Sequence, residues 1–456
     1  MAAGRRGSVR SPPPRQRYIP PMRRRRSNES HSTSASEALA RRAAADGALP
    51  SSERFVALLA RMLHEAGTPS HQLEGLVVSC AQRLGLEVYV YATPTSINIS
   101  VGLPGAQRVT NFRVDPGSPK LALLEATYRV ADKVVCGELD APGGVAALLS
   151  VQARRRSAST LVICLGYALF SAGAAQFLGG SWREMLGAFP VGFTVGAALA
   201  LARGRREREL LSEFGGAAVA MFVSACIVAL LASQGVSISL SIVSLAGVVT
   251  LLPGLALATA MSELSTRNLA SGSARFMGAV TTLVVVGMGT AIGARIASAL
   301  DLVGTVVTPL QASTPTQDHI ERIIGTMAIA AGMTVALQAR LARAPVVLAA
   351  CVFGWLAAET SRALVDPVLV PCLAATIVGV GGNLYARWRH RPTLAIVLPG
   401  LGLLLPGSIG FRGVQGLIAS DTAAGLNTAV SAMIIGASLA AGLLIANAIV
   451  PSPRNV

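Results

Sequence analysis

The chain has 456 residues, of which 52% are hydrophobic and 14% are charged, whereas an ordinary soluble protein carries roughly 25% charged residues. Its formal net charge is +16, and it contains 46 glycines, the residue that lets membrane helices approach one another closely. This composition excludes an ordinary soluble protein, and we expect a polytopic α-helical membrane protein.

Residues 1–51 are predicted to form a disordered basic tail. Its first 28 residues contain nine arginines and no acidic residue, and the tail is rich in Pro and Ser, so it cannot bury enough apolar surface to fold. A basic arm can bind nucleic acid. We favour contact with anionic lipid headgroups, where each basic residue contributes about 1 kcal/mol. No apolar core follows the arginines, so we do not expect the tail to be a signal peptide.

Residues 52–153 are predicted to form a small cytoplasmic α+β domain. Apolar residues at helical spacing predict one helix that stops at Gly67 and another that runs from about Ser70 to Gly85. Alternation and composition then predict three strands followed by two helices. The strands are expected at 87–91, 96–101 and 108–114, and the helices at 120–136 and 144–155.

His64, Glu65 and His71 invite comparison with the zinc-protease motif HExxH. That motif places two histidines four positions apart on one helix face, whereas these are seven apart and separated by a Gly-x-Pro break. None of the six cysteines belongs to a CxxC pair, and four lie in apolar segments. We therefore expect no metal site and no cofactor, and we interpret the domain as one that regulates or gates the membrane part.

The rest of the chain is predicted to cross the membrane ten times, since about 20 apolar residues span the hydrocarbon core. Arginines gather in every second loop, which predicts that both termini are cytoplasmic. We expect the protein to lie in the plasma membrane. Five spans in each half, 154–300 and 301–456, give the halves opposite orientations. The predicted spans are 158–178, 185–202, 214–233, 237–262, 276–298, 322–339, 345–363, 366–386, 393–411 and 425–449.

The fourth span of each predicted half contains the same break, Leu-Leu-Pro-Gly. It occurs at Leu251–Gly254 and at Leu404–Gly407, and the second copy follows Leu398-Pro399-Gly400. Broken helices at corresponding positions of inverted halves mark the midplane binding site of secondary transporters. The alternative is a pair of kinked helices without a ligand, since membrane helices tolerate Pro and Gly. We predict that the substrate is bound by Pro253, Gly254, Pro399, Gly400, Pro406, Gly407 and Ser408.

Three segments resemble the threonine/serine exporter family. They are the motif HEAGTPSHQLE at His64–Glu74 with Leu84-Gly85-Leu86 and Pro94-Thr95, the motif LLPGLALA from Leu251 with Ser271-Gly272 and Arg275, and the second-half motif Leu398-Pro399-Gly400 through Pro406-Gly407-Ser408.

The resemblance covers about residues 52–450. It implies export of threonine and serine from the cytoplasm, driven by the proton motive force, and related two-subunit members are linked to dicarboxylate export. Glu263 departs from the family pattern, which has an Asp in the fourth-helix motif, and the basic tail lies outside the pattern.

Polar side chains inside predicted spans are functional candidates, because their burial in hydrocarbon is costly. We interpret Glu359 as a proton-coupling residue, since an apolar helix stabilises the protonated carboxyl group. Glu263 is a second proton-coupling candidate, with a solvated residue at the end of its span as the alternative. Asn383 and Asn427 are predicted to hydrogen-bond a zwitterionic amino acid.

Of three functional classes, we favour a secondary exporter of small polar amino acids over a dicarboxylate exporter and a membrane-tethered regulatory or hydrolytic protein. A dicarboxylate exporter of the succinate type would require arginines that face the pathway, and the spans offer almost none beyond Arg295. A membrane-tethered regulatory or hydrolytic protein would require a catalytic constellation that the soluble domain lacks, so we do not expect an enzyme. The sequence contains no Walker motif. The expected partners are an amino acid, protons and anionic lipids, with a homo-oligomer left open and no nucleic acid.

Overall fold

The computed structural model describes residues 50–115, 119–154, 158–202, 209–302, 319–389, 391–403, 406–418 and 422–451. Residues 51–456 belong to one compact unit, separate from residues 1–50. The predicted basic tail lies almost entirely outside the described residues, so its disorder and its lipid contacts stay predictions. The division of the remaining chain into one domain and two membrane halves also stays a prediction.

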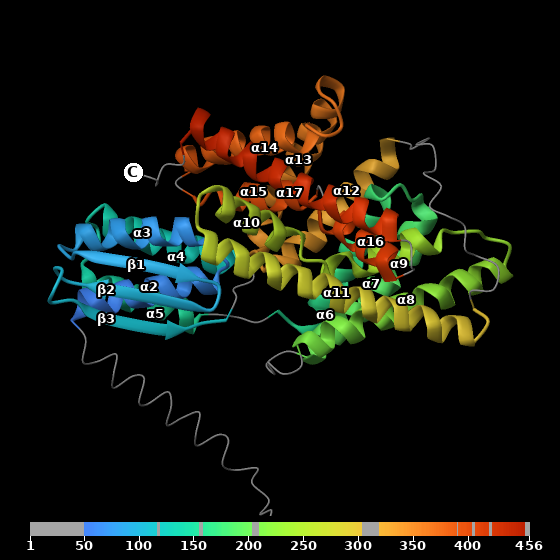
Figure 1. The fold of residues 1–456 in the computed structure, drawn as a ribbon, viewed down its shortest axis with the longest axis horizontal. Helices are drawn as coiled ribbons and strands as arrows, with labels where there is room; N and C mark the ends of the chain where they lie inside the picture. Colours follow the sequence, from blue (N-terminus) through green and yellow to red (C-terminus); the bar gives the residue numbers. More distant parts are fainter. Residues whose placement is uncertain are drawn as a thin grey trace, which may run out of the picture. The chain divides into compact units, whose positions relative to one another are not determined.

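The described chain begins with an α+β arrangement in which four helices pack with one small sheet (Figure 1). Strand β2 lies in the middle of the sheet and pairs antiparallel with both neighbours, so that Val90 and Thr110 flank Ile99. All seven elements lie within a few residues of their predicted positions. They are α2 (Ser51–Glu65), α3 (Ser70–Arg83), β1 (Val88–Thr93), β2 (Ser96–Val101), β3 (Arg108–Arg113), α4 (Leu121–Val135) and α5 (Ala141–Ala153).

The core of this arrangement follows from the sequence periodicity. Phe55, Leu59 and Leu63 recur every four residues on α2 and are completely buried. On β2, Ile97 and Ile99 alternate with more exposed residues and point to the same face. Helices α2 and α3 contact the sheet, so these side chains form a shared apolar core between helices and strands.

Six helices of the described residues are long and apolar enough to cross a membrane, and a bent pair raises the number to seven. The six are α6 (Thr160–Phe177), α7 (Trp182–Ala202), α8 (Glu209–Ser233), α11 (Leu269–Ala299), α13 (Ala344–Leu364) and α17 (Thr422–Ile449). The protein is therefore a multi-pass membrane protein. The predicted total of ten spans is not confirmed.

The bent pair consists of α9 (Leu240–Val248) with the short helix η2 (Val249–Leu251), followed by α10 (Gly254–Ser265), and its two parts meet at 56°. The other predicted spans coincide with α12 (His319–Ala336), α14 (Val370–Arg389), and α15 (Leu394–Gly402) with α16 (Pro406–Ile418). These helices remain predictions as membrane spans. The short helix η3 (Leu341–Arg343) precedes α13.

Corresponding helices of the two predicted halves make corresponding contacts. Helix α8 packs on α11 as α14 packs on α17, and α10 packs on α11 as α16 packs on α17. Between the halves, α10 contacts α17 and α11 contacts α16 (Figure 1). The second part of each broken helix therefore packs against the last helix of both halves. The opposite orientation of the halves stays a prediction.

The first break lies where the sequence predicts it. Leu252 is extended, with φ −74° and ψ 133°, and α10 begins directly after Pro253. In the second half, α15 continues through Pro399 and ends at Gly402, so the interruption falls between Gly402 and Pro406. The two interruptions are neighbours, since a Cβ added at Gly402 would lie 3.9 Å from Cδ2 of Leu255.

Candidate functional site

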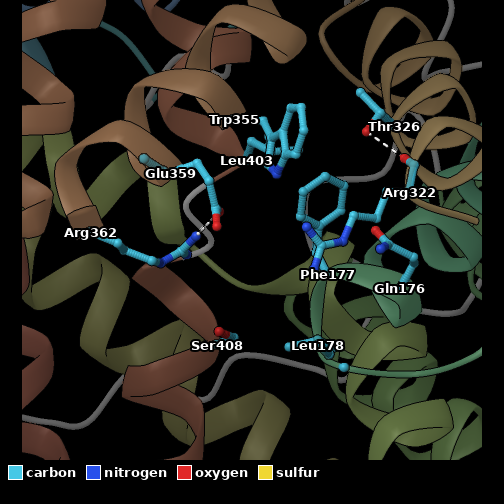
Figure 2. A pocket seen from close by; sticks show the side chains of 12 residues that line it. Gln176, Phe177, Leu178, Arg322, Thr326, Trp355, Glu359, Arg362, Leu403 and Ser408 are labelled. Carbon is cyan, nitrogen blue, oxygen red and sulfur yellow. Dashed lines mark hydrogen bonds and ion pairs between the residues drawn. The ribbon is translucent and has the colours of Figure 1, made fainter. Parts of the chain in front are cut away.

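A pocket of about 250 Å³ lies beside the second helix break (Figure 2). Pockets that hold drug-sized ligands have roughly 300–1,000 Å³, so this one suits a small metabolite. Its lining comes from α6, α12, α13 and the two segments on either side of the α15–α16 break. The lining residues are Gln176, Phe177, Leu178, Gly179, Arg322, Thr326, Trp355, Ala358, Glu359, Arg362, Leu403 and Ser408.

Helix α13 supplies one side of the pocket through helical spacing. Trp355, Glu359 and Arg362 are separated by four and three residues, which places their side chains on one face of the helix. Nη1 of Arg362 donates to Oε2 of Glu359 at 2.7 Å, and their side chains are 60% and 50% exposed. This ion pair is open to solvent inside the pocket, so both charges remain accessible to a ligand.

Helix α12 faces α13 across the pocket. Arg322 and Thr326 are one turn apart, and Oγ1 of Thr326 donates to the backbone oxygen of Arg322 at 2.7 Å. Figure 2 shows Arg322 on the side opposite Glu359 and Arg362. The end of α6 closes the pocket, where Gly179 adopts φ +93°, a conformation that glycine takes without strain.

The pocket therefore combines two guanidinium groups with one carboxylate and several uncharged polar groups. A guanidinium binds a carboxylate through paired hydrogen bonds, and a carboxylate accepts hydrogen bonds from an ammonium group. Thr326, Gln176 and Ser408 add hydroxyl and amide groups to the lining. This arrangement suits a small molecule that carries opposite charges and a further polar group.

A second polar cluster, which we call the Glu263 cluster, consists of Ser70, Glu263, Ser271 and Arg275. The Glu263 side chain is 0% exposed and that of Arg275 is 11% exposed. Nε and Nη2 of Arg275 donate to the two Glu263 carboxylate oxygens at 3.2 and 3.3 Å, and Oγ of Ser271 donates to Oε2 at 2.8 Å. Both carboxylate oxygens are therefore bonded within the described structure.

The Glu263 cluster also joins the α+β segment to the membrane part. The backbone N–H of Ser70 donates to Oε1 of Glu263 at 2.9 Å, and the hydroxyl groups of Ser70 and Ser271 lie 2.7 Å apart. Ser70 begins α3, whose N-cap residue Pro69 makes no side-chain cap bond. The Glu263 carboxylate supplies that cap and interacts favourably with the positive end of the helix dipole.

Two histidines of the α+β segment lie close to the Glu263 cluster. Nε2 of His64 lies 3.1 Å from the Pro94 carbonyl oxygen and 3.0 Å from that of Asp115, so it serves as a donor to backbone. Burial lowers the pKa of His64, and the positive charge of Arg275 lowers it further. Burial also lowers the pKa of His71, against the opposing effect of Glu263. Both imidazoles are thus stabilised in their neutral form.

Among the predicted site residues whose side chains the structure describes, Ser408 and Glu359 line the pocket. Glu359 lies in an apolar helix, and its carboxylate is half exposed and paired with Arg362. The alternative that Glu263 is solvated at the end of its span was wrong, because its side chain is completely buried. The proton-coupling roles of both residues stay predictions.

The predicted asparagines lie away from the pocket lining. Nδ2 of Asn383 donates to Oδ1 of Asn447 at 2.9 Å and to the Val450 carbonyl oxygen at 2.7 Å, and its Oδ1 accepts from Thr393 at 3.1 Å. These bonds fix the packing of α14 on the end of α17. Asn427 is exposed near the start of α17.

The Pro-Gly residues also differ in their surroundings. Pro399 and Gly400 are buried against α13, where a Cβ added at Gly354 would collide with the Gly400 carbonyl group. Pro253 and Gly254 form the half-buried start of α10. Pro406 and Gly407 begin α16, and their side-chain surroundings lie outside the described part of the chain, as do Leu404 and Leu405.

Sequence reasoning missed Gln176, Arg322, Thr326, Trp355 and Arg362 as pocket residues. The spacing of Trp355, Glu359 and Arg362 on one helix face was the available signal on α13. Nothing in the sequence shows that the end of α6 and the start of α12 meet that face. In the described ranges, no group of three or more His, Cys, Asp or Glu side chains is arranged to hold a metal ion.

Comparison with known proteins links both polar regions to one family. Two family models, both described as threonine/serine exporter, match residues 54–297 and 318–449. The first match contains the Glu263 cluster, and the second contains α13, α15 and α16. No solved structure matches the chain significantly.

Curated relatives are similar over large parts of the chain. A threonine/serine exporter of Corynebacterium glutamicum is 27% identical over 287 residues, which cover 62% of this chain and 58% of the relative. Pheromone-regulated membrane protein 10 of Candida albicans is 25% identical over 393 residues, covering 83% of this chain and 34% of the relative. Pheromone-regulated membrane protein 10 of Eremothecium gossypii is 22% identical over 364 residues, which cover 78% of this chain and 48% of the relative. The chain thus spans about a third to three fifths of these relatives.

Proposed function

Because the chain belongs to the threonine/serine exporter family, we propose that it is a secondary transporter that exports small polar amino acids through the pocket between α6, α12, α13 and α16. The family is one of exporters, not of enzymes, and the chain is a multi-pass membrane protein. The observation that carries the proposal is the pairing of opposite charges around a pocket of metabolite size.

The charges of the pocket match those of an amino acid. We assign Arg322 to the substrate carboxylate and Glu359 to the ammonium group. Thr326 and Ser408 provide hydroxyl groups for the hydroxyl of threonine or serine. Arg362 holds the Glu359 carboxylate until the ammonium group competes for it, because their ion pair is solvent-exposed and weak.

The neighbouring helix breaks provide the second part of the proposed site. A helix break frees backbone groups that a polar solute can bind without a complete buried charge on the protein. Oγ1 of Thr250, directly before the first break, is buried and has no hydrogen-bond partner within the described residues. A passing substrate hydroxyl would satisfy this group, which favours a pathway from the pocket toward α10.

In the predicted topology, the pocket and the Glu263 cluster lie on opposite sides of the membrane. The pocket lies at the end of α6, the start of α12 and the end of α13, which are predicted to face outside. The Glu263 cluster lies where α10 meets α11, which is predicted to face the cytoplasm. With this topology, the proposal is a transporter that is open outward, with its inner side held by the α+β domain.

Proton coupling is assigned to Glu359. Its carboxylate lines the pocket and is half exposed, so protons and substrate reach the same group. Protonation would neutralise the proposed ammonium ligand and release the substrate on the acidic side of the membrane.

One observation favours a second candidate, export of a dicarboxylate. Arg322 and Arg362 both line the pocket, and two guanidinium groups can bind two carboxylates. Glu359 neutralises part of this positive charge and repels an anion. We therefore rank the amino acid first, although the two arginines make succinate a necessary competitor in the test.

Efflux from proteoliposomes separates these substrates. Vesicles loaded with threonine, serine or succinate are given an inward proton gradient, and efflux is compared for the wild type and the Arg322→Gln and Glu359→Gln variants. We expect efflux of threonine and serine, reduced at least tenfold in both variants. Arg183→Gln, another exposed arginine on the predicted outer side, is the matched control and should export normally. Efflux of succinate alone would overturn the assignment.

A further inference from the structure

A third charged region connects α4 to the second membrane half. The Glu125 carboxylate of α4 is 8% exposed; its Oε2 forms an ion pair with Nε of Arg343 at 3.2 Å and accepts a hydrogen bond from Nη1 of Arg391 at 3.4 Å. Arg343 precedes α13, and Arg391 lies between α14 and α15. One carboxylate oxygen therefore holds arginines from two separate loops.

Two further arginines border the same place. Arg129 is one turn after Glu125 on α4, and Arg340 lines a small recess together with Glu125 and Arg343. Arg129 and Arg340 are both exposed. Partial desolvation of the guanidinium group lowers the pKa of Arg129, the positive charges of Arg391 and Arg340 lower it further, and Glu125 opposes them. The positive charges of Arg391 and Arg340 thus act unfavourably on the Arg129 guanidinium group.

The charge of this region is unbalanced. Two guanidinium groups pair with Glu125, Arg340 lines the same recess and Arg129 lies one turn further along α4, so these five side chains carry a formal excess of three positive charges. The backbone N–H of Leu121 donates to the Leu337 carbonyl oxygen at 2.8 Å, which holds the start of α4 against the end of α12. The arginines therefore converge on a fixed junction, and an anion bound there would reduce their mutual repulsion.

We propose that Arg129, Arg340, Arg343 and Arg391 form a binding site for a phosphate group, and that this site joins α4 to the second membrane half. Guanidinium groups bind phosphate oxygens through paired hydrogen bonds. Three of the four arginines adjoin the ends of α12, α13 and α14, where lipid headgroups meet a membrane protein. The phosphate belongs to an anionic lipid headgroup or to a soluble phosphate compound.

The site is separate from the pocket and from the Glu263 cluster, and it implies regulation of the exporter by its surroundings. A bound phosphate would add its charge to that of Glu125 and hold the loops of Arg343 and Arg391 against α4. Loss of the phosphate would leave repulsion between these loops and α4. The packing of α4 on the second half would then depend on the lipid or phosphate supply.

Thermal unfolding in a neutral detergent tests the proposal, because a ligand that binds the folded protein raises its Tm. One series contains increasing phosphatidylglycerol, another contains phosphatidylcholine, and a third contains inorganic pyrophosphate. We expect phosphatidylglycerol to raise the Tm and phosphatidylcholine to have no effect. A response to pyrophosphate alone would identify a soluble phosphate compound as the ligand.

The Arg129→Gln/Arg340→Gln double variant removes the two exposed arginines and leaves the Glu125 ion pairs intact. The concentration needed for half of the Tm shift should rise roughly 30-fold, from about 1 kcal/mol for each arginine. The matched control, Arg113→Gln/Arg183→Gln, removes two exposed arginines elsewhere and should keep the wild-type response. Equal losses in the two double variants, or no response of the wild type to either phosphate probe, would overturn the proposal.

Discussion

The pocket and the Glu263 cluster each contain a carboxylate bonded to an arginine, but the two carboxylates differ in their exposure to solvent. Glu263 is 0% exposed and receives hydrogen bonds from Arg275, Ser271 and the Ser70 backbone. Glu359 is 50% exposed and bonds to Arg362 beside an open volume of about 250 Å³. One carboxylate is bonded on both oxygens by the protein, and the other faces space that a ligand can occupy.

This difference separates a structural role from a functional role for the same residue type. Breaking a buried ion pair leaves an uncompensated charge and costs about 3–5 kcal/mol, whereas an exposed pair is worth about 0–1 kcal/mol. Glu263 also caps α3, so it connects two parts of the chain. We infer that Glu263 stabilises the contact between the α+β segment and the membrane part, and that Glu359 serves transport.

The largest expected effect is the loss of stability in Glu263→Gln. Its unfolding free energy should fall by about 3–5 kcal/mol, because Arg275 loses its buried counter-charge. Glu359→Gln should lose less than about 1 kcal/mol. Chemical unfolding in detergent measures both values. Equal stabilities of the two variants would remove the distinction between the regions.

A smaller effect, on transport alone, is expected for Arg322→Gln. Loss of a hydrogen bond to a charged group costs about 1.5–3 kcal/mol, so the KM for threonine efflux should rise roughly 10- to 150-fold. The folded protein should lose less stability than Glu263→Gln, because Arg322 lines the pocket whereas Glu263 is completely buried. An unchanged KM in a stable variant would place carboxylate recognition elsewhere.

The Ser271→Ala variant tests whether the Glu263 cluster contributes to stability and not to transport. The variant removes one hydrogen bond to Glu263 and the contact with Ser70, while Arg275 keeps its ion pair. We expect a loss of about 1–2 kcal/mol in unfolding free energy, smaller than that of Glu263→Gln. The KM for threonine should not change, and a large change in KM would assign Ser271 to the substrate pathway.

The smallest expected effect is a pH dependence near the Glu263 cluster. The pKa of His64 and that of His71 are lowered in the folded protein from the ordinary value of 6.5, chiefly by burial. Below pH 6.5 the unfolded chain therefore binds more protons, and stability present above that pH is lost as the pH falls. The His71→Asn variant should show a shallower decline in Tm between pH 7 and pH 5 than the wild type. An identical slope would show that His71 does not contribute.

Helices and strands whose residue pattern is local could be predicted from the sequence. Periodicity and the glycine stops predict all seven elements of the α+β segment, and Gly67 and Gly85 do end α2 and α3 in left-handed conformations, with φ +78° and +71°. The first Pro-Gly break was also predicted correctly. The second was predicted at Leu404–Gly407, and α15 does end at Gly402 while α16 begins at Pro406. Pro399, which precedes that motif, lies inside α15, because Pro is tolerated in membrane helices.

The candidate site could not be assembled from local patterns. Hydropathy shows that Glu359 lies in an apolar segment, but it does not show which face of α13 carries the residue or what lies opposite. Arg322 is separated from Glu359 along the chain and meets the pocket only because α12 packs on both α6 and α13. The cap that Glu263 supplies to Ser70 likewise joins residues 193 positions apart.

Tryptophan fluorescence tests most directly whether the pocket is the substrate site. The chain has three tryptophans, of which Trp355 lines the pocket while Trp182 and Trp388 are exposed elsewhere, so Trp182→Phe/Trp388→Phe leaves Trp355 as the only reporter. We predict that threonine changes the Trp355 emission in a saturable manner, that Arg322→Gln abolishes the change at the same concentration, and that Ser271→Ala preserves it. Threonine export without any change in Trp355 emission, or a response that survives Arg322→Gln, would contradict the account.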